Sequence, residues 1–443
     1  MIAKERAQEI IRQTLRFSKA EEASVSLSDG QSANLRFARN TASTSGAETG
    51  PSLSVTSIFG KRAGTATVNQ LDEATLKAAV ARSEEIARLA PEDPERMPLL
   101  GPQEHAAIAA WDETTAREGA ERMAAGAAAV IKEATGHQLV AAGFTRTAAR
   151  AEALGNSKGL FAYHRATTAS FSTTFRTRDG SGSGWAGRAA RAIGEVDYAG
   201  AAAVAAQKAL ASQKPRKLEP GSYRTILEPC CVASLLELMT DDMDRRKADE
   251  GRSWFASRKG GTRLGEQLFG RAIDIRSDPG DRQVPARPWS GEGLAHRARH
   301  WIQAGKLSAL SCDRFWADKK KVEPVPAAPN IIMAGGKGSL EDLIKSTRRG
   351  VLVTSFWYIR EVDPQTMLHT GLTRDGVFWI ENGAIAYPVN NFRWNESPVA
   401  VLKRVEAMSA AQRLPSRGAE TPTTVVPALA VSSFGFTSVS DAV

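Results

Sequence analysis

Two patterns of hydrophobic and polar residues divide the first third of the chain into helices and strands. Residues 2–17 place their apolar side chains at helical spacing. Residues 23–27 and 33–37 then alternate between apolar and polar side chains, which is the period of a half-buried strand. The dipeptide Asp29-Gly30 lies between them and predicts the turn of a hairpin.

The same alternation returns further along the chain. Residues 52–59 and 62–68 predict a second pair of strands joined at Gly60, and an Ala-rich helix is expected at about 71–89. A helix capped by Asp112 or Thr114 follows. Alternating segments at 138–190 then predict an antiparallel meander, and a last Ala-rich helix is expected at about 201–212.

From residue 216 the chain consists mainly of strand segments separated by Gly- and Pro-rich turns. A helix is predicted from Pro229, a residue suited to the first helical turn, to about Arg246. Strands are expected at 223–227, 330–333, 350–360, 376–380, 384–388 and 428–437. These patterns predict an α+β protein with an N-terminal domain at 1–95, a middle domain at 96–215 and a C-terminal domain at 216–443 that is rich in antiparallel sheet.

Composition is that of a soluble globular protein. Hydrophobic residues make up 42% and charged residues 24% of the 443 residues, and no apolar run reaches the roughly 20 residues of a membrane span. The N-terminus has no apolar signal core, and only three cysteines occur, so a reducing cytoplasm is expected. The net charge of +9 is spread along the chain, which disfavours nucleic acid as a partner.

A specific group of motifs lies between residues 357 and 398. It contains Trp-Tyr-Ile-Arg at 357–360, Thr-Gly-Leu-Thr-Arg-Asp-Gly at 370–376 and Ile-Glu-Asn-Gly at 380–383, followed by Asn391, Arg393 and Ser397. In this order the motifs resemble the C-terminal core of the TldD/PmbA family, "TGxTRDGxFxIENG" followed by "NxRF(N)xS". Trp394 stands where Phe is usual. The resemblance runs from about residue 20 to about residue 440.

The core motif also contains the side chains expected to contact a substrate. Asp375-Gly376 and Asn382-Gly383 are turn dipeptides, so the residues between them predict a tight β-meander. Arg374 and Asp375 are candidates for binding a ligand or for orienting a loop. Arg360 and His369, which are close to the core in sequence, complete the predicted substrate-binding set.

The resemblance also implies where a metal site belongs. Catalytic members of the family carry His-Glu-x-x-x-His on the helix after the first strand of the C-terminal domain, with a late Cys ligand. Here Leu236-Glu237 falls near the first His-Glu, and Asp241 falls near the second His. No cysteine occurs after Cys312. Without the imidazoles or the late thiolate, we expect no metal, no cofactor and no catalytic residue in this degenerate site.

Two other groups of residues are candidate sites. His296 and His300 are four residues apart, the spacing of one helical face, but Arg297 and Arg299 beside them disfavour a cation. The adjacent Cys230 and Cys231 at a helix start suit a lowered thiol pKa, but buried packing is the more common role of such cysteines.

The family resemblance implies a function shared by two subunits. A zinc-bearing TldD-type chain and a metal-free PmbA/TldE-type chain together cut unfolded peptides, and this sequence is of the second type. The alternative is an active hydrolase with unusual groups, for which Glu237, Asp241, His369 and Cys312 are the candidates. A third alternative is a non-enzymatic module tied to DNA topology, as the family's modulator-of-DNA-gyrase name suggests.

Overall fold

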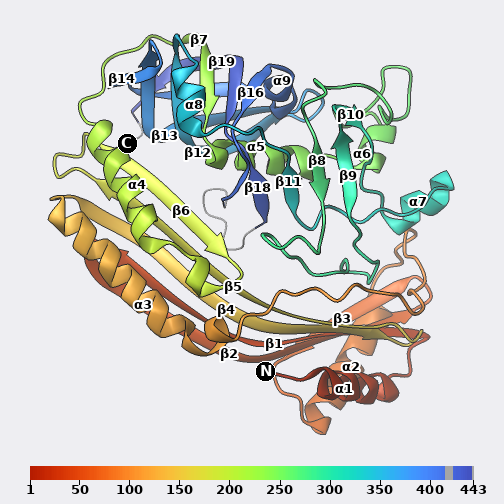
Figure 1. Cartoon of the computed structure of the whole chain (residues 1–443). Coiled ribbons are helices and arrows are strands. Elements are labelled where there is room, and N and C mark those ends of the chain that lie inside the picture. Colours follow the sequence, from red (N-terminus) through yellow and green to blue (C-terminus); the bar gives the residue numbers. More distant parts are fainter. Residues whose placement is uncertain (415–422, 442–443) are drawn as a thin grey trace.

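One long antiparallel sheet organises the first half of the chain and lies at the bottom of Figure 1. The computed structural model describes residues 1–414 and 423–441. Six strands lie in the order β3-β2-β1-β4-β5-β6. Their bounds are β1 Glu22–Ala38, β2 Thr41–Phe59, β3 Arg62–Val68, β4 Val140–Asn156, β5 Phe161–Arg176 and β6 Ser183–Ala190. Because β1 pairs with β4, the N-terminal and middle blocks share this sheet, and residues 90–112 link them.

Four helices pack on the sheet, and each pair of them buries one hydrophobic core against it. They are α1 Lys4–Phe17, α2 Glu73–Leu89, α3 Glu113–Gly136 and α4 Tyr198–Ala211, with a short 3-10 turn η1 at Ile193–Glu195. Helices α1 and α2 cover one end of the sheet, where Ile10 meets Val25 and Leu53 in one buried cluster. Helices α3 and α4 cover the other end around Phe37 and Phe171. Figure 1 shows α1, α2 and α3 on the side of the sheet away from the C-terminal domain.

The hairpin predicted at Asp29-Gly30 is wrong. Strand β1 runs unbroken through both residues, and the chain reverses at Arg39 and Asn40, which have positive φ values of 52° and 60°. Gly30 serves close packing instead, because a Cβ atom there would lie 2.4 Å from the carbonyl oxygen of Ala149 on β4. The other predicted elements of this half, including the turn at Gly60 and the meander of β4 to β6, are confirmed.

The C-terminal half contains a seven-stranded sheet that closes on itself. Its order is β12-β7-β19-β15-β13-β14, β12 also pairs with β13, and β16 pairs with β19. The bounds are β7 Gly221–Leu227, β12 Arg349–Asp363, β13 Leu368–Glu381, β14 Ala384–Pro388, β15 Asn391–Glu396, β16 Val405–Met408 and β19 Leu429–Ser440. Large aromatic side chains, among them Phe356, Trp394 and Phe434, are fully or almost fully buried in its core. The predicted α+β class is confirmed.

A smaller sheet and five short helices complete the C-terminal half. The sheet has the order β10-β9-β8-β11-β18-β17. Its bounds are β8 Ile275–Ser277, β9 Arg299–Gln303, β10 Lys306–Leu307, β11 Ile331–Met333, β17 Gln412–Arg413 and β18 Thr424–Val426. The helices are α5 Pro229–Asp241, α6 Arg245–Asp249, α7 Arg314–Lys320, α8 Leu340–Lys345 and α9 Pro398–Lys403.

Three predictions for this half need correction. The helix expected to reach Arg246 ends at Asp241, and α6 follows after a short break. His300 lies on strand β9, so it does not share a helical face with His296. Asp375-Gly376 is not a turn, because β13 continues through it. The φ values at these two residues are positive, 58° and 122°. They mark a bulge in β13, and the pairing of β13 with β12 shifts its register after Val353.

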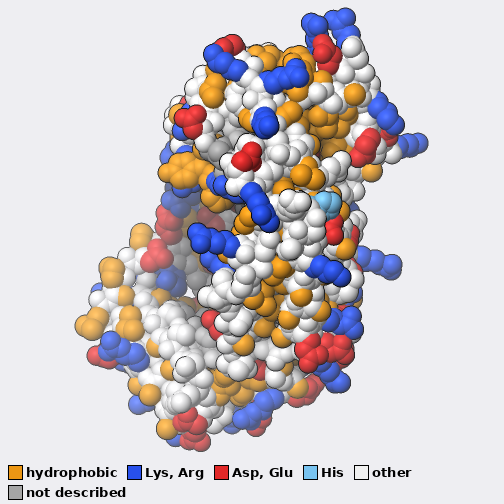
Figure 2. All heavy atoms as spheres, turned by 90° about the vertical axis from the view of Figure 1, so that its left-hand side faces the viewer, with side chains coloured by type: hydrophobic (Ala, Val, Ile, Leu, Met, Phe, Trp, Pro, Cys, Tyr) orange, Lys and Arg blue, Asp and Glu red, His pale blue; other side chains and the backbone are white. Residues whose placement is uncertain are grey.

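Charged side chains do not gather on one side of the face that Figure 2 presents. Lys and Arg side chains are spread from its top to its bottom, and Asp and Glu lie between them. Among the described residues, no helix is long and apolar enough to cross a membrane.

Three histidines gather around Trp289 where the N-terminal sheet meets the C-terminal domain. The rings of His105 and His164 contact Trp289 at centroid distances of 5.5 and 6.1 Å. Burial, together with a smaller contribution from the positive charge of Arg287, lowers the pKa of His164 and of His296 to about 4. The folded protein therefore keeps both rings neutral at pH values where the unfolded chain protonates them.

We expect this cluster to make the fold sensitive to acid. The pKa of His164 is about 4 in the folded chain against an ordinary 6.5, so its contribution is complete above about pH 6.5 and is lost as the pH falls towards 4. The loss approaches about 3 kcal/mol. In urea unfolding at pH 7 and pH 5, His164→Phe should lose less stability on acidification than the wild type. His137→Phe, at an exposed position, should behave as the wild type; an unchanged pH dependence in His164→Phe would contradict the assignment.

Candidate functional site

The family resemblance places the metal motif on helix α5. Contacts at the start of this helix hold it in place. Pro229 occupies the start of the helix, and the Glu228 side chain just before it accepts a hydrogen bond from Lys208 Nζ on α4 at 2.6 Å. Cys230 and Cys231 are buried, and the Cys231 thiol donates to the Val353 carbonyl of β12 at 3.6 Å. Burial raises the pKa of Cys231 well above its usual range, so this thiol serves packing.

A pocket of about 400 Å³ lies between α5 and the second half of β12. Glu237 and Asp241, one helical turn apart, line its α5 side. Leu236 points the other way and is completely buried in the core of the C-terminal half. Thus α5 directs Glu237 and Asp241, together with Ser234 and Leu238, towards the pocket and Leu236 towards the core. Nine residues line the pocket: Ser234, Glu237, Leu238, Asp241, Phe356, Trp357, Tyr358, Ile359 and Arg360.

Two exposed aromatic side chains form the wall of the pocket opposite the carboxylates. Trp357 is 42% exposed and Tyr358 is 56% exposed, although both belong to a central strand. The positive φ of 53° at Tyr358 and a register shift between Trp357 and Arg360 show that β12 bulges here. The guanidinium of Arg374 lies 5.1 Å from the Trp357 ring centre, and that of Arg360 lies 4.3 Å from the Tyr358 ring centre. The bulge therefore exposes two aromatic rings, each with a guanidinium group close to its face.

The carboxylates at the end of α5 hold protons more tightly than usual. Partial burial raises the pKa of Asp241, and the positive charge of Lys247 opposes that rise. Burial also raises the pKa of Asp242, which accepts hydrogen bonds from Ser253 Oγ at 2.9 Å and from Lys247 Nζ at 3.2 Å. The charge of Glu361 raises the pKa of Asp242 further. Burial is therefore the main cause of the raised pKa values at this end of α5.

The structure divides the predicted substrate-binding residues between different places. Arg360 lines the pocket, and Arg374 reaches its edge by stacking on Trp357. His369 is not among the lining residues; it is 5% exposed, and its Nδ1 lies 3.0 Å from the Met367 carbonyl oxygen. Asp375 is 1% exposed and accepts a hydrogen bond of 2.5 Å from Ser183 Oγ on β6, so it joins the C-terminal domain to the long sheet.

Trp357 and Tyr358 were not among the predicted site residues. The sequence has three consecutive aromatic residues, Phe356 to Tyr358, where a half-buried strand would alternate, and that departure was the available signal. Cys312, a candidate residue of the active-hydrolase alternative, lies in a separate buried cluster with Trp316, and burial raises its pKa to about 11. His300, which was weighed as a metal ligand, lies 3.0 Å from Asp274 Oδ1.

The residues that line the pocket do not fit the zinc ion that the family resemblance implies. Structural and catalytic zinc sites are built mainly from imidazole and thiolate ligands, but the lining contains no histidine or cysteine, and its charged groups are the carboxylates of Glu237 and Asp241 and the guanidinium of Arg360. Within residues 1–414 and 423–441, no group of three or more His, Cys, Asp or Glu side chains is arranged to hold a metal ion.

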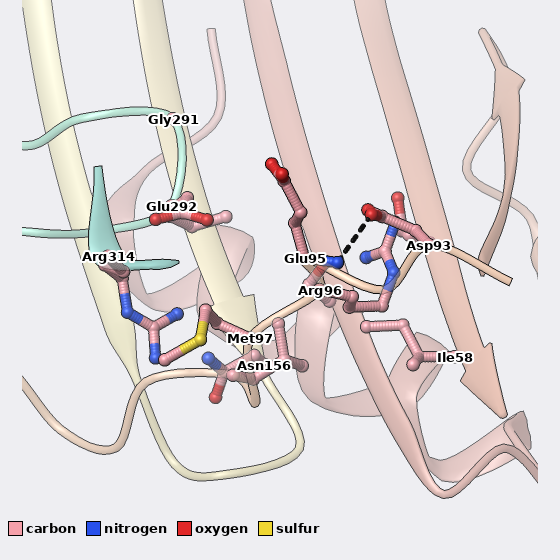
Figure 3. Close-up of a pocket in the computed structure, with 13 residues that line it drawn as sticks. Ile58, Asp93, Glu95, Arg96, Met97, Asn156, Gly291, Glu292 and Arg314 are labelled. Atoms are coloured by element: carbon pink, nitrogen blue, oxygen red, sulfur yellow. Dashed lines mark hydrogen bonds and ion pairs between the residues drawn. The ribbon is translucent and has the colours of Figure 1, made fainter. Parts of the chain in front are cut away.

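A second pocket, of about 290 Å³, lies where the linker meets both halves of the molecule (Figure 3). Figure 3 shows Glu95 and Arg96 of the linker beside Glu292 and Arg314 of the C-terminal domain. Both oxygens of Glu95 accept hydrogen bonds of 2.6 Å from Arg246 on α6, and Arg314 donates to the Pro98 carbonyl at 2.7 Å. These contacts fix the linker against the C-terminal domain.

Comparison with protein families identifies the class to which this fold and pocket belong. Three models described as PmbA/TldA metallopeptidase domains match in succession: domain 1 over residues 23–87, the central domain over 109–213 and the C-terminal domain over 220–438. The class is therefore that of the metallopeptidase-related chains built from these three units. The chain belongs to the PmbA/TldD family.

Solved structures share the whole fold at low sequence identity. TldE from Thermococcus kodakarensis has a TM-score of 0.86 at 17% identity, covering 97% of this chain and 99% of that chain. A protein from Bacteroides thetaiotaomicron described as a candidate modulator of DNA gyrase has a TM-score of 0.85 at 19% identity, covering 99% and 100%. A curated relative, the metalloprotease PmbA homolog of Buchnera aphidicola, is 29% identical over 129 residues, and the match spans 28% of each protein.

We expect the position of α5 to depend on the pair between Lys208 and Glu228. Their side chains are only 16% and 12% exposed, so Lys208→Met leaves a largely buried carboxylate without its cation. The free energy of unfolding should fall by roughly 3 kcal/mol. Lys217→Met is the matched control, because Lys217 and Glu219 form a pair whose side chains are 75% and 71% exposed, and it should cause no measurable change. Equal losses in the two variants, measured by urea unfolding, would show that the pair does not anchor α5.

Proposed function

We propose that this chain is a metal-free subunit of the TldE/PmbA type in a heteromeric peptidase, and that it holds an unfolded peptide for cleavage by a zinc-bearing TldD-type partner. The observation that carries the proposal is the orientation of α5. Its Leu236 is buried in the core, and the ionisable side chains that it directs to the pocket are the carboxylates of Glu237 and Asp241. In a pocket without imidazole or thiolate, binding rather than metal-assisted hydrolysis is the supported role.

The shape of the pocket suits an extended peptide. The parallel pairing of β7 with β12 ends at Val353, and the pocket begins three residues later at Phe356. A peptide laid along this part of β12 would extend the sheet through main-chain hydrogen bonds, which are independent of side-chain identity. Trp357 and Tyr358 would cover its side chains with aromatic surface, and the α5 carboxylates would face its polar groups.

The first test of the proposal is metal content measured together with peptide cleavage. The purified chain should contain far less than one zinc per chain and should not cleave an unfolded peptide. Cleavage should appear when a zinc-bearing TldD-type relative is added, because the catalytic water is then supplied by the partner. One zinc per chain together with cleavage by the isolated chain would favour the alternative of an active hydrolase.

A second test addresses the aromatic wall. Trp357→Ala should weaken binding of a fluorescently labelled, unfolded peptide by about tenfold, as expected for an aromatic residue at the centre of an interface. Fluorescence anisotropy of the chain mixed with the partner, with the partner's metal chelated to prevent turnover, measures this affinity. Ile385→Ala is the matched control, because Ile385 is 45% exposed on β14 and does not line the pocket. Equal affinities in Trp357→Ala and the wild type would remove this wall from the peptide site.

A further inference from the structure

The pocket of Figure 3 is formed by parts of the chain that are far apart in the sequence. One side comes from strands β1 and β2 through Ser24 and Thr56, and another comes from the linker at 93–99. The C-terminal half contributes Glu292 and Arg314. The volume of about 290 Å³ is at the lower end of the range for small-molecule sites, so a ligand here must be small.

Two guanidinium groups at this pocket have hydrogen-bond donors to offer a ligand. Arg314 donates to the Pro98 carbonyl at 2.7 Å but, among the described residues, it pairs with no carboxylate. The Nε atom of Arg96 is buried and has no hydrogen-bond partner in the described part of the chain, and Arg96 Nη2 lies 3.9 Å from Asp93 Oδ2. A buried donor without an acceptor costs free energy, so a ligand that accepts from it is favoured. A carboxylate is the acceptor that best fits guanidinium groups.

The rest of the lining offers a negative charge and hydrocarbon. Glu292 pairs with no cation among the residues that the structure describes. The carboxylate of Glu95, by contrast, already accepts two hydrogen bonds from Arg246. Four apolar side chains also line the pocket: Ile58, Met97, Leu99 and Leu154. A ligand that carries a carboxylate, an ammonium group and an apolar side chain therefore matches each part of the lining.

We propose that this pocket binds a small zwitterion with an apolar side chain, of the size of a dipeptide. Arg96 and Arg314 hold its carboxylate, Glu292 holds its ammonium group, and the four apolar residues contact its side chain. A simple anion leaves the negative charge and the apolar wall unused, and an apolar molecule leaves the guanidinium groups without acceptors. The pocket at α5 shares no lining residue with this one, so the inference does not depend on the proposed peptidase role.

The test is a calorimetric titration of the whole chain with the dipeptide alanyl-leucine. The wild type should bind it saturably, and Arg96→Met and Arg314→Met should each weaken binding by at least about tenfold, because each variant removes a charge-assisted hydrogen bond. Glu292→Gln should weaken binding by only about threefold, because Glu292 is exposed. Arg258→Met is the matched control, since Arg258 is exposed and does not line the pocket, and it should leave the affinity unchanged.

Two further titrations check the chemistry and the place of binding. N-acetyl-alanyl-leucine amide has the same side chains but neither terminal charge, and it should not bind measurably. Trp357→Ala should leave the affinity for alanyl-leucine unchanged, because Trp357 lines only the pocket at α5. Equal binding of the capped and the free dipeptide would overturn the proposal. So would a loss of affinity in Trp357→Ala that Arg314→Met does not share, because the dipeptide would then occupy the pocket at α5.

Hydrogen exchange of the wild type keeps the proposal testable if the arginine variants fold poorly. Saturating alanyl-leucine should slow the exchange of backbone amides at 93–99 and 291–293, because a bound ligand opposes local opening of the segments that hold it. Amides around Trp357 should exchange at the same rate with and without the dipeptide. An absence of binding by the wild type, or protection confined to the pocket at α5, would overturn the proposal.

Discussion

The pairing of β1 on both of its edges is the constraint on which the rest of the structure depends. Its partners are β2, which follows it directly, and β4, which lies more than 100 residues further along the chain. Gly30 permits this arrangement, since any Cβ atom there would collide with the backbone of β4. Because β1 is central, two blocks that are separate in sequence become one platform with helices α1 to α4 packed on it.

The platform in turn fixes the candidate site. Ser183 on β6 binds Asp375 on β13, and Lys208 on α4 binds Glu228 at the start of α5. The two elements that form the pocket are therefore held in place from the long sheet: α5 directly, and β12 through its pairing with β13. Asp375, which belongs to the most specific motif in the sequence, contributes to this attachment rather than to the pocket wall. A charged residue in a family motif can thus orient one half of a protein on the other instead of binding a substrate.

Helix α5 lies where the resemblance places the metal motif, but its Leu236 contributes to the hydrophobic core. Leu236, at the position that the resemblance assigns to a metal-binding histidine, is completely buried among the residues of the C-terminal core. A leucine at this point gains hydrophobic stabilisation, whereas a histidine would need a metal or a hydrogen-bond partner to be buried there. The opposite face of α5 keeps Glu237 and Asp241 at the pocket.

Local sequence patterns determined the α+β class, most helices and most strands, because apolar periodicity and capping residues such as Asp112 act within a few neighbours. The family motifs also located the helix on which the site is built. Tertiary structure decided what the patterns could not, since the same dipeptide has different roles in different surroundings. Asp29-Gly30 continues a central strand because β4 approaches closely, and Asp375-Gly376 forms a bulge anchored by Ser183. The aromatic wall of the pocket likewise exists only because β12 bulges at Tyr358, and that bulge depends on its register with β13.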